Sequence, residues 1–174
     1  MVKKINIVLY EPEIAQNVGA IIRTSKAVNA KLHIIEPTGF IFDSRFLKRA
    51  SVNYVDQSDI VLYDDWSQFI NKNNNPVLFC STRYGVKKHT DFNYKKQIDS
   101  EKEIYILFGK ESTGIPKDII INNKETSFRI PMHKDVRSLN VAVSVSIVAY
   151  EVVRQLDFEN LELFEYQKGK NFIL

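Results

Sequence analysis

The sequence has one cysteine, so no disulfide can form within the chain. A lone thiol is typical of a protein that works in a reducing compartment. Cys80 ends a short apolar run, which predicts a buried structural thiol rather than a reactive one. The three histidines, His33, His89 and His133, have no paired spacing. This argues against a zinc site built by the protein, and we expect no metal.

Long apolar runs are also missing. No segment approaches the roughly 20 apolar residues that a membrane-spanning helix needs. The apolar stretch near the N-terminus is too short for a signal peptide. We therefore expect a cytoplasmic protein with no membrane partner.

Two common nucleotide-binding fingerprints are absent as well. The first expected strand is followed by Glu11-Pro12-Glu13 rather than by GxGxxG, and no Walker A sequence occurs anywhere. No serine lies in a GxSxG elbow, so a serine hydrolase of that type is unsupported. The sequence therefore lacks the motifs of the common nucleotide-binding and hydrolytic sites of α/β proteins.

What is present is an ordinary globular composition. The 174 residues are 44% hydrophobic and 26% charged, with a formal net charge of +3. This length predicts a single domain over residues 1–174 with a sizeable core. The mildly basic charge permits an anionic partner such as nucleic acid without establishing one.

Short apolar runs alternate with segments of helical periodicity, which predicts an α/β fold with a mostly parallel sheet flanked by helices. The expected strands are residues 5–10, 31–35, 52–55, 60–63, 77–81, 104–108 and 126–130. The expected helices are residues 17–29, capped by Gln16 or Asn17, and residues 44–50, 66–70 and 116–122. Residues 91–102 read as mixed loop and helix, and residues 161–174 as a weakly amphipathic tail.

Residues 140–156 are ambiguous from pattern alone. Their valines alternate with small residues as in a strand, but the segment has no Gly or Pro and is too long for an ordinary strand. We expect a helix capped by Ser138 or Asn140. Its small residues would allow close approach of another backbone, or would serve plain core packing. For Tyr150, core packing and contact with RNA or a second subunit are both open.

Polar loops follow three of the apolar strands, at residues 82–88, 109–116 and 131–139. Open α/β sheets place their ligand sites in such loops at the ends of strands. A further basic cluster, Arg45, Lys48 and Arg49, lies on the expected helix 44–50. It reads either as a solvated face or as a phosphate contact.

Three motifs together resemble those of the SPOUT methyltransferases: N-x-G-x-I-x-R from Asn17, F-G-x-E-x-x-G-I-P from Phe108, and I-P-M-x-x-x-x-R-S-L-N from Ile130. The resemblance is closest to the compact members that methylate the ribose 2′-oxygen of the wobble nucleotide in tRNA. It covers nearly the whole chain. Two positions depart from the family pattern, which often has Pro where this chain has Lys110 and Thr where it has Ser112.

This resemblance implies a parallel sheet whose C-terminal part forms a deep trefoil knot, an obligate homodimer, and S-adenosylmethionine as the methyl donor, released as S-adenosylhomocysteine. The positions that match cofactor contacts, mostly through main chain, are Ser81, Gly109, Ile130 and Ser138. Met132 and Leu139 adjoin them and are expected to wall the adenine. Core packing is the plain reading of Ile130 and Leu139, and it would coexist with that role.

The same resemblance implies that Arg23 is catalytic, with the tRNA anticodon loop as the partner. The pKa of a guanidinium makes a literal base hard to accept, so we expect Arg23 to stabilise the alkoxide or to grip a phosphate. Glu111 is expected to orient Arg23, and Asn17 and Asn140 to complete a polar cage. A structural capping role is the alternative for Glu111 and Asn17. Methylation of ribosomal RNA, or RNA binding without catalysis, are the alternative functions.

Overall fold

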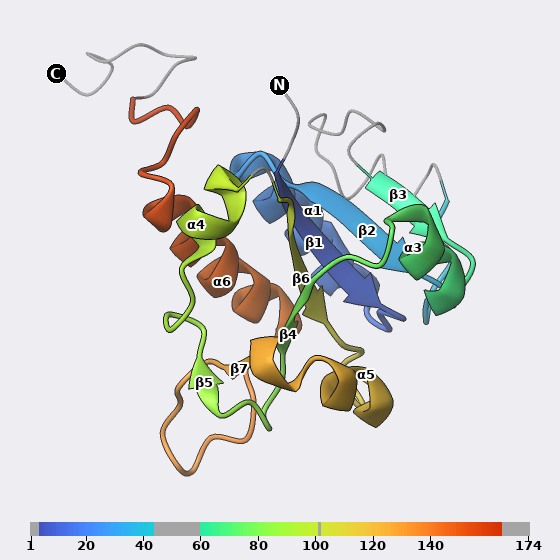
Figure 1. Cartoon of the computed structure of the whole chain (residues 1–174). Coiled ribbons are helices and arrows are strands. Elements are labelled where there is room, and N and C mark those ends of the chain that lie inside the picture. Colours follow the sequence, from blue (N-terminus) through green and yellow to red (C-terminus); the bar gives the residue numbers. More distant parts are fainter. Residues whose placement is uncertain (1–3, 44–59, 101, 165–174) are drawn as a thin grey trace, which may run out of the picture.

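The computed structural model describes residues 4–43, 60–100 and 102–164, which form a parallel sheet with helices on both faces (Figure 1). The strands are β1 (Ile5–Tyr10), β2 (Lys31–Ile35), β3 (Ile60–Tyr63), β4 (Leu78–Ser81), β5 (Lys87–Lys88), β6 (Ile104–Phe108) and β7 (Ser127–Arg129). The helices are α1 (Ala15–Ala27), α3 (Trp66–Lys72), α4 (Tyr94–Asp99), α5 (Lys117–Asn122), the 3-10 turn η2 (Lys124–Thr126) and α6 (Val141–Gln155).

The strands form one sheet in the order β3-β2-β1-β6-β4-β7-β5, and every pair of neighbours is parallel. From β1 the chain first moves outward to β2 and β3, and later strands build the other half of the sheet. The direction of winding therefore reverses between β1 and β6. In open parallel sheets, ligands bind at the carboxyl ends of the strands beside such a reversal.

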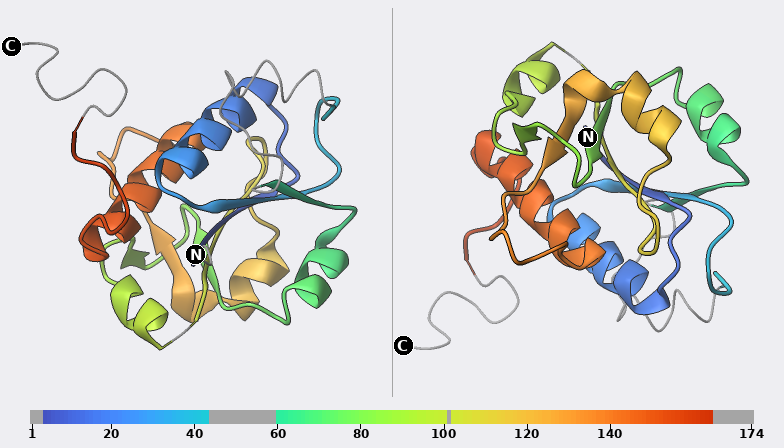
Figure 2. Two further views of the ribbon diagram at one scale, coloured as in Figure 1. Left: turned by 90° about the horizontal axis from the view of Figure 1, so that it is seen from above. Right: turned by 90° about the horizontal axis from the view of Figure 1, so that it is seen from below.

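Each face of the sheet has its own apolar core. Alternate residues of β1, such as Ile7 and Leu9, pack against α1, α4 and α6, whereas Val8 faces α3 and α5. Views from above and below show α1 and α6 together on one side and α3 and α5 on the other (Figure 2). Because both faces are covered, the central strands β1, β6 and β4 are mostly apolar along their length, as their sequences indicated.

The second face also buries a polar group. The Nδ1 atom of His33 lies 2.7 Å from Tyr63 Oη, and Nε2 lies 2.9 Å from Asn6 Oδ1. Burial lowers the pKa of His33 to about 3, so the ring is neutral at pH 7. With both ring nitrogens hydrogen-bonded, this histidine is a structural core residue.

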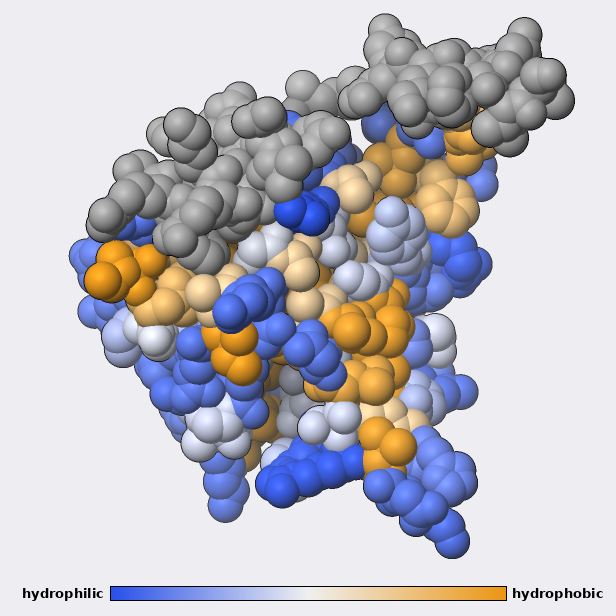
Figure 3. Space-filling model, turned by 180° about the vertical axis from the view of Figure 1, so that it is seen from behind, coloured by the Kyte–Doolittle hydropathy of each residue, from blue (hydrophilic) through white to orange (hydrophobic). Residues whose placement is uncertain are grey.

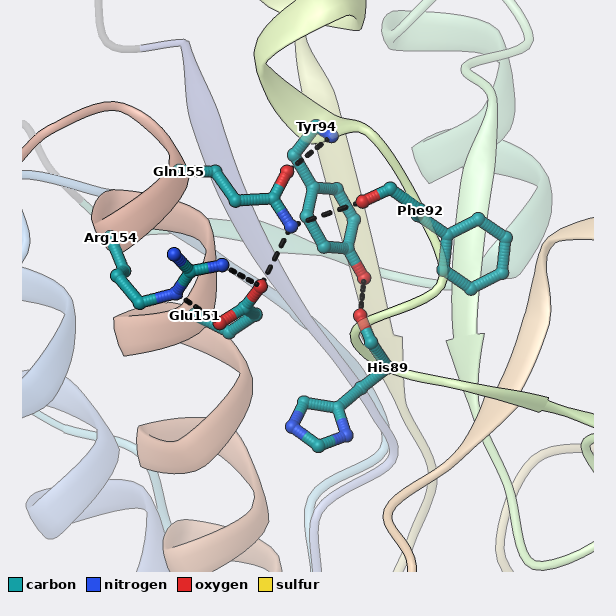
Figure 4. A network of polar contacts seen from close by, with 6 residues as sticks. All are labelled: His89, Phe92, Tyr94, Glu151, Arg154 and Gln155. Carbon is teal, nitrogen blue, oxygen red and sulfur yellow. Dashed lines mark hydrogen bonds and ion pairs between the residues drawn. The ribbon is translucent and has the colours of Figure 1, made fainter.

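The segment before α4 is tied to α6 by a polar network (Figure 4). Gln155 accepts from Tyr94 N at 2.8 Å and donates to the carbonyl of Phe92 at 3.0 Å. Tyr94 Oη donates to the carbonyl of His89 at 3.0 Å, and Gln155 is held in turn by Glu151. Residues 89–94 are therefore fixed to the body of the protein.

Most expected elements are confirmed, including a helix over the ambiguous 140–156 segment. Cys80 is buried, and burial raises the pKa of its thiol to about 12, as expected for a structural cysteine. The expectation of a plain loop at residues 82–88 was wrong at its end, because Lys87 and Lys88 pair with β7 as an edge strand. The expected helix 44–50, with Arg45, Lys48 and Arg49, and the expected strand 52–55 lie outside the described residues.

One helix start differs from expectation, and another decides between two expected caps. The first helix begins at Ala15 with Ile14 as N-cap, so neither Gln16 nor Asn17 caps it. The last helix is capped by Asn140 rather than by Ser138, since the side chain of Asn140 accepts from Ala142 N and Val143 N. Among the described helices, none has the length and apolar character needed to cross a membrane.

Candidate functional site

Three of the positions expected to contact a cofactor meet at the carboxyl edge of the sheet. Ser81, the last residue of β4, is opposite Phe108 of β6 on one side and Phe128 of β7 on the other. Gly109 directly follows Phe108, and Ile130 lies two residues beyond Phe128. The order β6-β4-β7 therefore gathers these three positions on neighbouring strand ends, although they are far apart in the sequence.

Gly109 is required by the shape of its own loop. A Cβ at this position would meet the carbonyl carbon of Gly114 at 2.1 Å and Ile115 N at 2.2 Å, so no side chain fits. The loop folds back because Gly114 N donates to the carbonyl of Lys110 at 2.8 Å, with Gly114 at φ +77°. The glycines of this motif shape the loop that carries Glu111.

The loop at residues 131–139 combines exposed polar groups with a few apolar side chains. Ser138 is exposed, Met132 and Leu139 are half-buried, and Ile130 is buried. Both Ile130 and Leu139 pack in the core beside α6, so the core-packing reading of these two residues is confirmed. Half-buried apolar side chains beside exposed polar residues fit a ligand with a flat apolar ring and polar edges, such as an adenine nucleoside.

Asn17, Glu111 and Asn140 form one chain of hydrogen bonds across three segments. Asn17 Nδ2 donates to Glu111 Oε1 at 2.7 Å, and Asn140 Nδ2 donates to Asn17 Oδ1 at 2.9 Å. Asn140 Oδ1 in turn accepts from Ala142 N at 2.8 Å. The structure therefore brings together three of the four expected catalytic residues.

This chain has a fixed direction. The partners of each amide determine which end is oxygen and which is nitrogen, so neither Asn17 nor Asn140 can flip without losing hydrogen bonds. The chain runs from the first turn of α6 to the carboxylate of Glu111, which also accepts from Glu13 N at 2.9 Å. A negative charge is thereby linked to the positive end of the α6 dipole.

A second set of contacts joins the same loops and was missed by sequence reasoning. Glu13 accepts from Ser112 N at 2.8 Å and from Ser112 Oγ at 2.7 Å, and Lys110 forms an ion pair with Glu11 at 2.5 Å. The hydrogen bonds from Ser112 hold the pKa of Glu13 below its usual value. The two departures from the family pattern, Lys110 and Ser112, are thus the residues that bind the Glu11-Pro12-Glu13 turn. The two glutamates that follow the first strand, Glu11 and Glu13, were the feature of the sequence from which these contacts could have been predicted.

Arg23 lies on the exposed side of α1. It shares a helix face with Gly19, four residues earlier, whereas Asn17 points inward and is buried. Pairing between Arg23 and Glu111 stays a prediction. Among the described residues, no group of three or more His, Cys, Asp or Glu side chains is placed to hold a metal ion.

Comparisons with known proteins agree with this arrangement. A model of the SpoU rRNA Methylase family matches residues 4–150. An Escherichia coli (strain K12) protein named tRNA (cytidine(34)-2′-O)-methyltransferase is 39% identical over 88% of this chain and 95% of its own length. A Geobacillus stearothermophilus protein, given the same name provisionally, is 38% identical over 90% of this chain and 98% of its own. A solved structure described as showing 2-OH methylation of C/U34 on tRNA superposes with a TM-score of 0.78, at 35% identity, over 89% of this chain and 97% of that one.

Proposed function

This chain belongs to the SpoU rRNA Methylase family, and we propose that it transfers a methyl group from S-adenosylmethionine to the ribose 2′-oxygen of nucleotide 34, a cytidine or uridine, in tRNA. The substrate follows the relatives of similar length, whose names specify cytidine 34 of tRNA. The observation that carries the proposal is the hydrogen-bonded chain of Asn17, Glu111 and Asn140 beside the ends of β6, β4 and β7.

The cofactor positions are Ser81, Gly109, Ile130 and Ser138, with Met132 and Leu139 as apolar walls for the adenine. When bound there, S-adenosylmethionine supplies an activated methyl group and leaves as S-adenosylhomocysteine. The loop that carries Ile130 and Leu139 is anchored in the core beside α6. Because this loop is anchored, its main chain should lose little conformational entropy when the cofactor binds.

The catalytic residues supply position and charge. Arg23 stabilises the oxygen as it loses its proton, or holds the adjacent phosphate, because a planar guanidinium offers two parallel donors to either group. Asn17, Asn140 and Glu111 fix the loop beside it, and water or an RNA phosphate accepts the proton. Placing the ribose oxygen against the methyl donor is the main contribution of the protein to the rate.

The assembly is part of the proposal. We take the protein to act as a homodimer on the anticodon loop, with residues 1–174 as one domain and the C-terminal part threaded into a trefoil knot. The apolar residues Val143 and Tyr150 remain exposed on α6, and the view from behind shows apolar side chains gathered across that face (Figure 3). A cytoplasmic location follows from the single cysteine and from the substrate.

The proposal is tested in cells that lack this protein. Nucleotide-resolution mapping of ribose methylation in total tRNA and ribosomal RNA should show loss at position 34 of a subset of tRNAs, with all ribosomal sites unchanged. Re-expression of the wild-type chain should restore the modification. Loss at a ribosomal site with intact tRNA would replace tRNA by ribosomal RNA as the substrate, and no loss anywhere would favour an RNA-binding protein without catalysis.

A further inference from the structure

Tyr84 is unusually open to solvent for a large aromatic residue. Its side chain is 66% exposed, more than that of any other aromatic residue in the described part of the chain, and its neighbour Val86 is 83% exposed. Both lie in the loop between β4 and β5. One exposed aromatic residue is unremarkable in itself. Its surroundings, however, restrict what it can bind.

The loop that carries Tyr84 is held rigidly against β7. Thr82 N donates to the carbonyl of Phe128 at 2.9 Å, and Arg129 Nη1 donates to the carbonyl of Arg83 at 2.7 Å. Gly85 lies directly on the backbone of Phe128, where a Cβ would come within 2.2 Å of its carbonyl carbon. The exposed ring is therefore presented by a fixed backbone, which reduces the entropy lost when a partner binds.

The other end of this segment is anchored as well. His89 N donates to the carbonyl of Arg129, and the network around Tyr94 and Gln155 fixes the following residues to α6 (Figure 4). The Tyr84 loop thus lies between two attachment points on the body of the protein. Its open ring is a feature of an ordered surface.

One face of the Tyr84 ring is covered by a cation. The guanidinium carbon of Arg83 lies 4.8 Å from the ring centroid, and Arg83 Nη2 donates to Tyr84 Oη at 2.5 Å. Because a ring has two faces, the exposed area belongs to the opposite face and the edge. If a flat group stacked on the opposite face, the Tyr84 ring would lie between the Arg83 guanidinium and that group.

The charges near the ring favour an anionic partner. Lys87 and Lys88 are neutralised by Glu125 and Asp91. In contrast, neither Arg83 nor Arg129 has an acidic partner within ion-pair distance in residues 4–43, 60–100 and 102–164. A rigid aromatic ring beside guanidinium groups that have no acidic partner matches an unpaired nucleotide, whose base stacks while its phosphates meet the cations. A protein partner would favour more apolar surroundings than these.

The Tyr84 loop also lies next to the candidate site in the fold. Ser81 directly precedes this loop, and Phe128, on which the loop is pinned, lies two residues before Ile130. We propose that Tyr84, backed by Arg83 and flanked by Arg129, is a stacking platform for an unpaired base of the RNA substrate that neighbours the methylated nucleotide. This inference rests on the proposed function, since it needs a single-stranded RNA loop at that edge.

The test measures binding of an anticodon stem–loop RNA by fluorescence anisotropy. Loss of one base–aromatic stack weakens binding by roughly 10- to 100-fold, so Tyr84→Ala should raise the Kd by that factor, while Tyr84→Phe should stay within about threefold of wild type. Ile121→Ala, which removes another exposed side chain on α5, is the matched control and should leave the Kd unchanged. A fully duplex RNA should bind wild type and Tyr84→Ala equally.

A second variant reads stacking directly. The fluorescence of the new tryptophan in Tyr84→Trp is obtained by subtracting the Trp66 signal of the wild type. The stem–loop RNA should quench this fluorescence, and the duplex RNA should not. Methyl transfer to tRNA is assayed on the same preparations. Wild type that binds the stem–loop without methylating tRNA would contradict the proposed function alone. Wild-type affinity in Tyr84→Ala, or a Tyr84→Trp signal that RNA does not quench, would overturn the platform. Wild type that fails to bind the stem–loop would overturn both.

Discussion

Asn140 serves two purposes at once. Its side-chain oxygen caps α6, and its amide nitrogen donates to Asn17 in the chain that leads to Glu111. The residue that starts the last helix therefore also orients the candidate catalytic loop. Stability and geometry of the site are linked at this one side chain.

This double role predicts a graded response to substitution. Asn140→Ala removes the cap and the donor to Asn17, and should lower the free energy of unfolding by about 1.5–3 kcal/mol, since a lost N-cap costs about 0.5–2 kcal/mol and a hydrogen bond about 1 kcal/mol. Asn140→Ser keeps a capping oxygen without placing a charged acceptor against Asn17 Oδ1, and should lose clearly less. Urea denaturation of both variants measures the difference. Equal stability of Asn140→Ala and wild type would mean that the cap contributes nothing.

Arg23 allows a sharper test of catalysis. Arg23→Lys keeps the charge but loses the planar pair of donors, and one preorganised contact of this kind is worth about 3–4 kcal/mol, or a hundred- to thousand-fold in rate. The cofactor positions lie in other loops, so affinity for S-adenosylmethionine should change by less than about tenfold. Tritiated methyl incorporation and calorimetry give the two values. A lysine variant with near wild-type transfer would remove Arg23 from the mechanism, and lost cofactor binding would make it a structural residue.

At the scale of single residues, sequence motifs identified Asn17, Glu111 and Asn140 as members of one site. They gave neither the direction of their hydrogen bonds nor the part played by Glu11 and Glu13. Those contacts join residues almost one hundred positions apart, and only the pairing of β1 with β6 brings them together. The local sequence pattern does not indicate contacts between residues so far apart in the chain.

At the scale of elements, α1 and α6 act as a packed pair. Thr24 Oγ1 and Ser146 Oγ lie 3.0 Å apart, and the small residues Ala142 and Ala149 are buried. The small side chains of α6 thus serve packing within the chain. Tyr150 is exposed, so the core-packing reading of that residue was wrong.

The exposed stripe of α6 predicts self-association. Val143, Ile147 and Tyr150 recur at the i, i+4 and i+7 spacing of one helix face, and the first and last are 48% and 47% exposed. A second copy would cover this stripe about a twofold axis. Light scattering should therefore give twice the 20.2 kDa of one chain at micromolar concentration. Val143→Asp should shift the mass towards 20.2 kDa, and a wild-type mass of one chain would rule out the dimer at that concentration.

At the scale of the whole molecule, buried His33 makes stability depend on pH. Its folded pKa of about 3 lies below the unfolded value of 6.5, so the unfolded chain takes up the proton first. The contribution of neutral His33 is fully present above pH 6.5 and is lost as the pH falls towards 3. Its share of the free energy of unfolding should fall by about 1.4 kcal/mol per pH unit.

Urea denaturation between pH 5 and 6.5 isolates this effect from the carboxylates. The slope of the free energy of unfolding against pH should be smaller in His33→Gln than in wild type. His133→Gln, which makes the same replacement at an exposed histidine, is the matched control. An unchanged slope in His33→Gln would show that this histidine does not titrate differently on unfolding.

The parallel α/β class of the whole molecule was predictable because alternation of apolar strands and amphipathic helices admits few other architectures. The strand order was not, since β6 and β7 insert between strands formed by other parts of the chain. β5 was also beyond prediction. Two lysines have little intrinsic preference for a strand, and Lys87 and Lys88 form one only because β7 offers an open edge.

Methyl transfer to one ribose oxygen can be measured with a chemically defined substrate. Purified protein and S-adenosylmethionine are incubated with two tRNAs that differ only at nucleotide 34, one with cytidine and one with 2′-deoxycytidine, and the digested products are analysed by mass spectrometry. We expect 2′-O-methylcytidine at position 34 of the first tRNA and no methyl group anywhere in the second. Methylation of the deoxy substrate, or of any nucleotide other than 34 in the first, would contradict it.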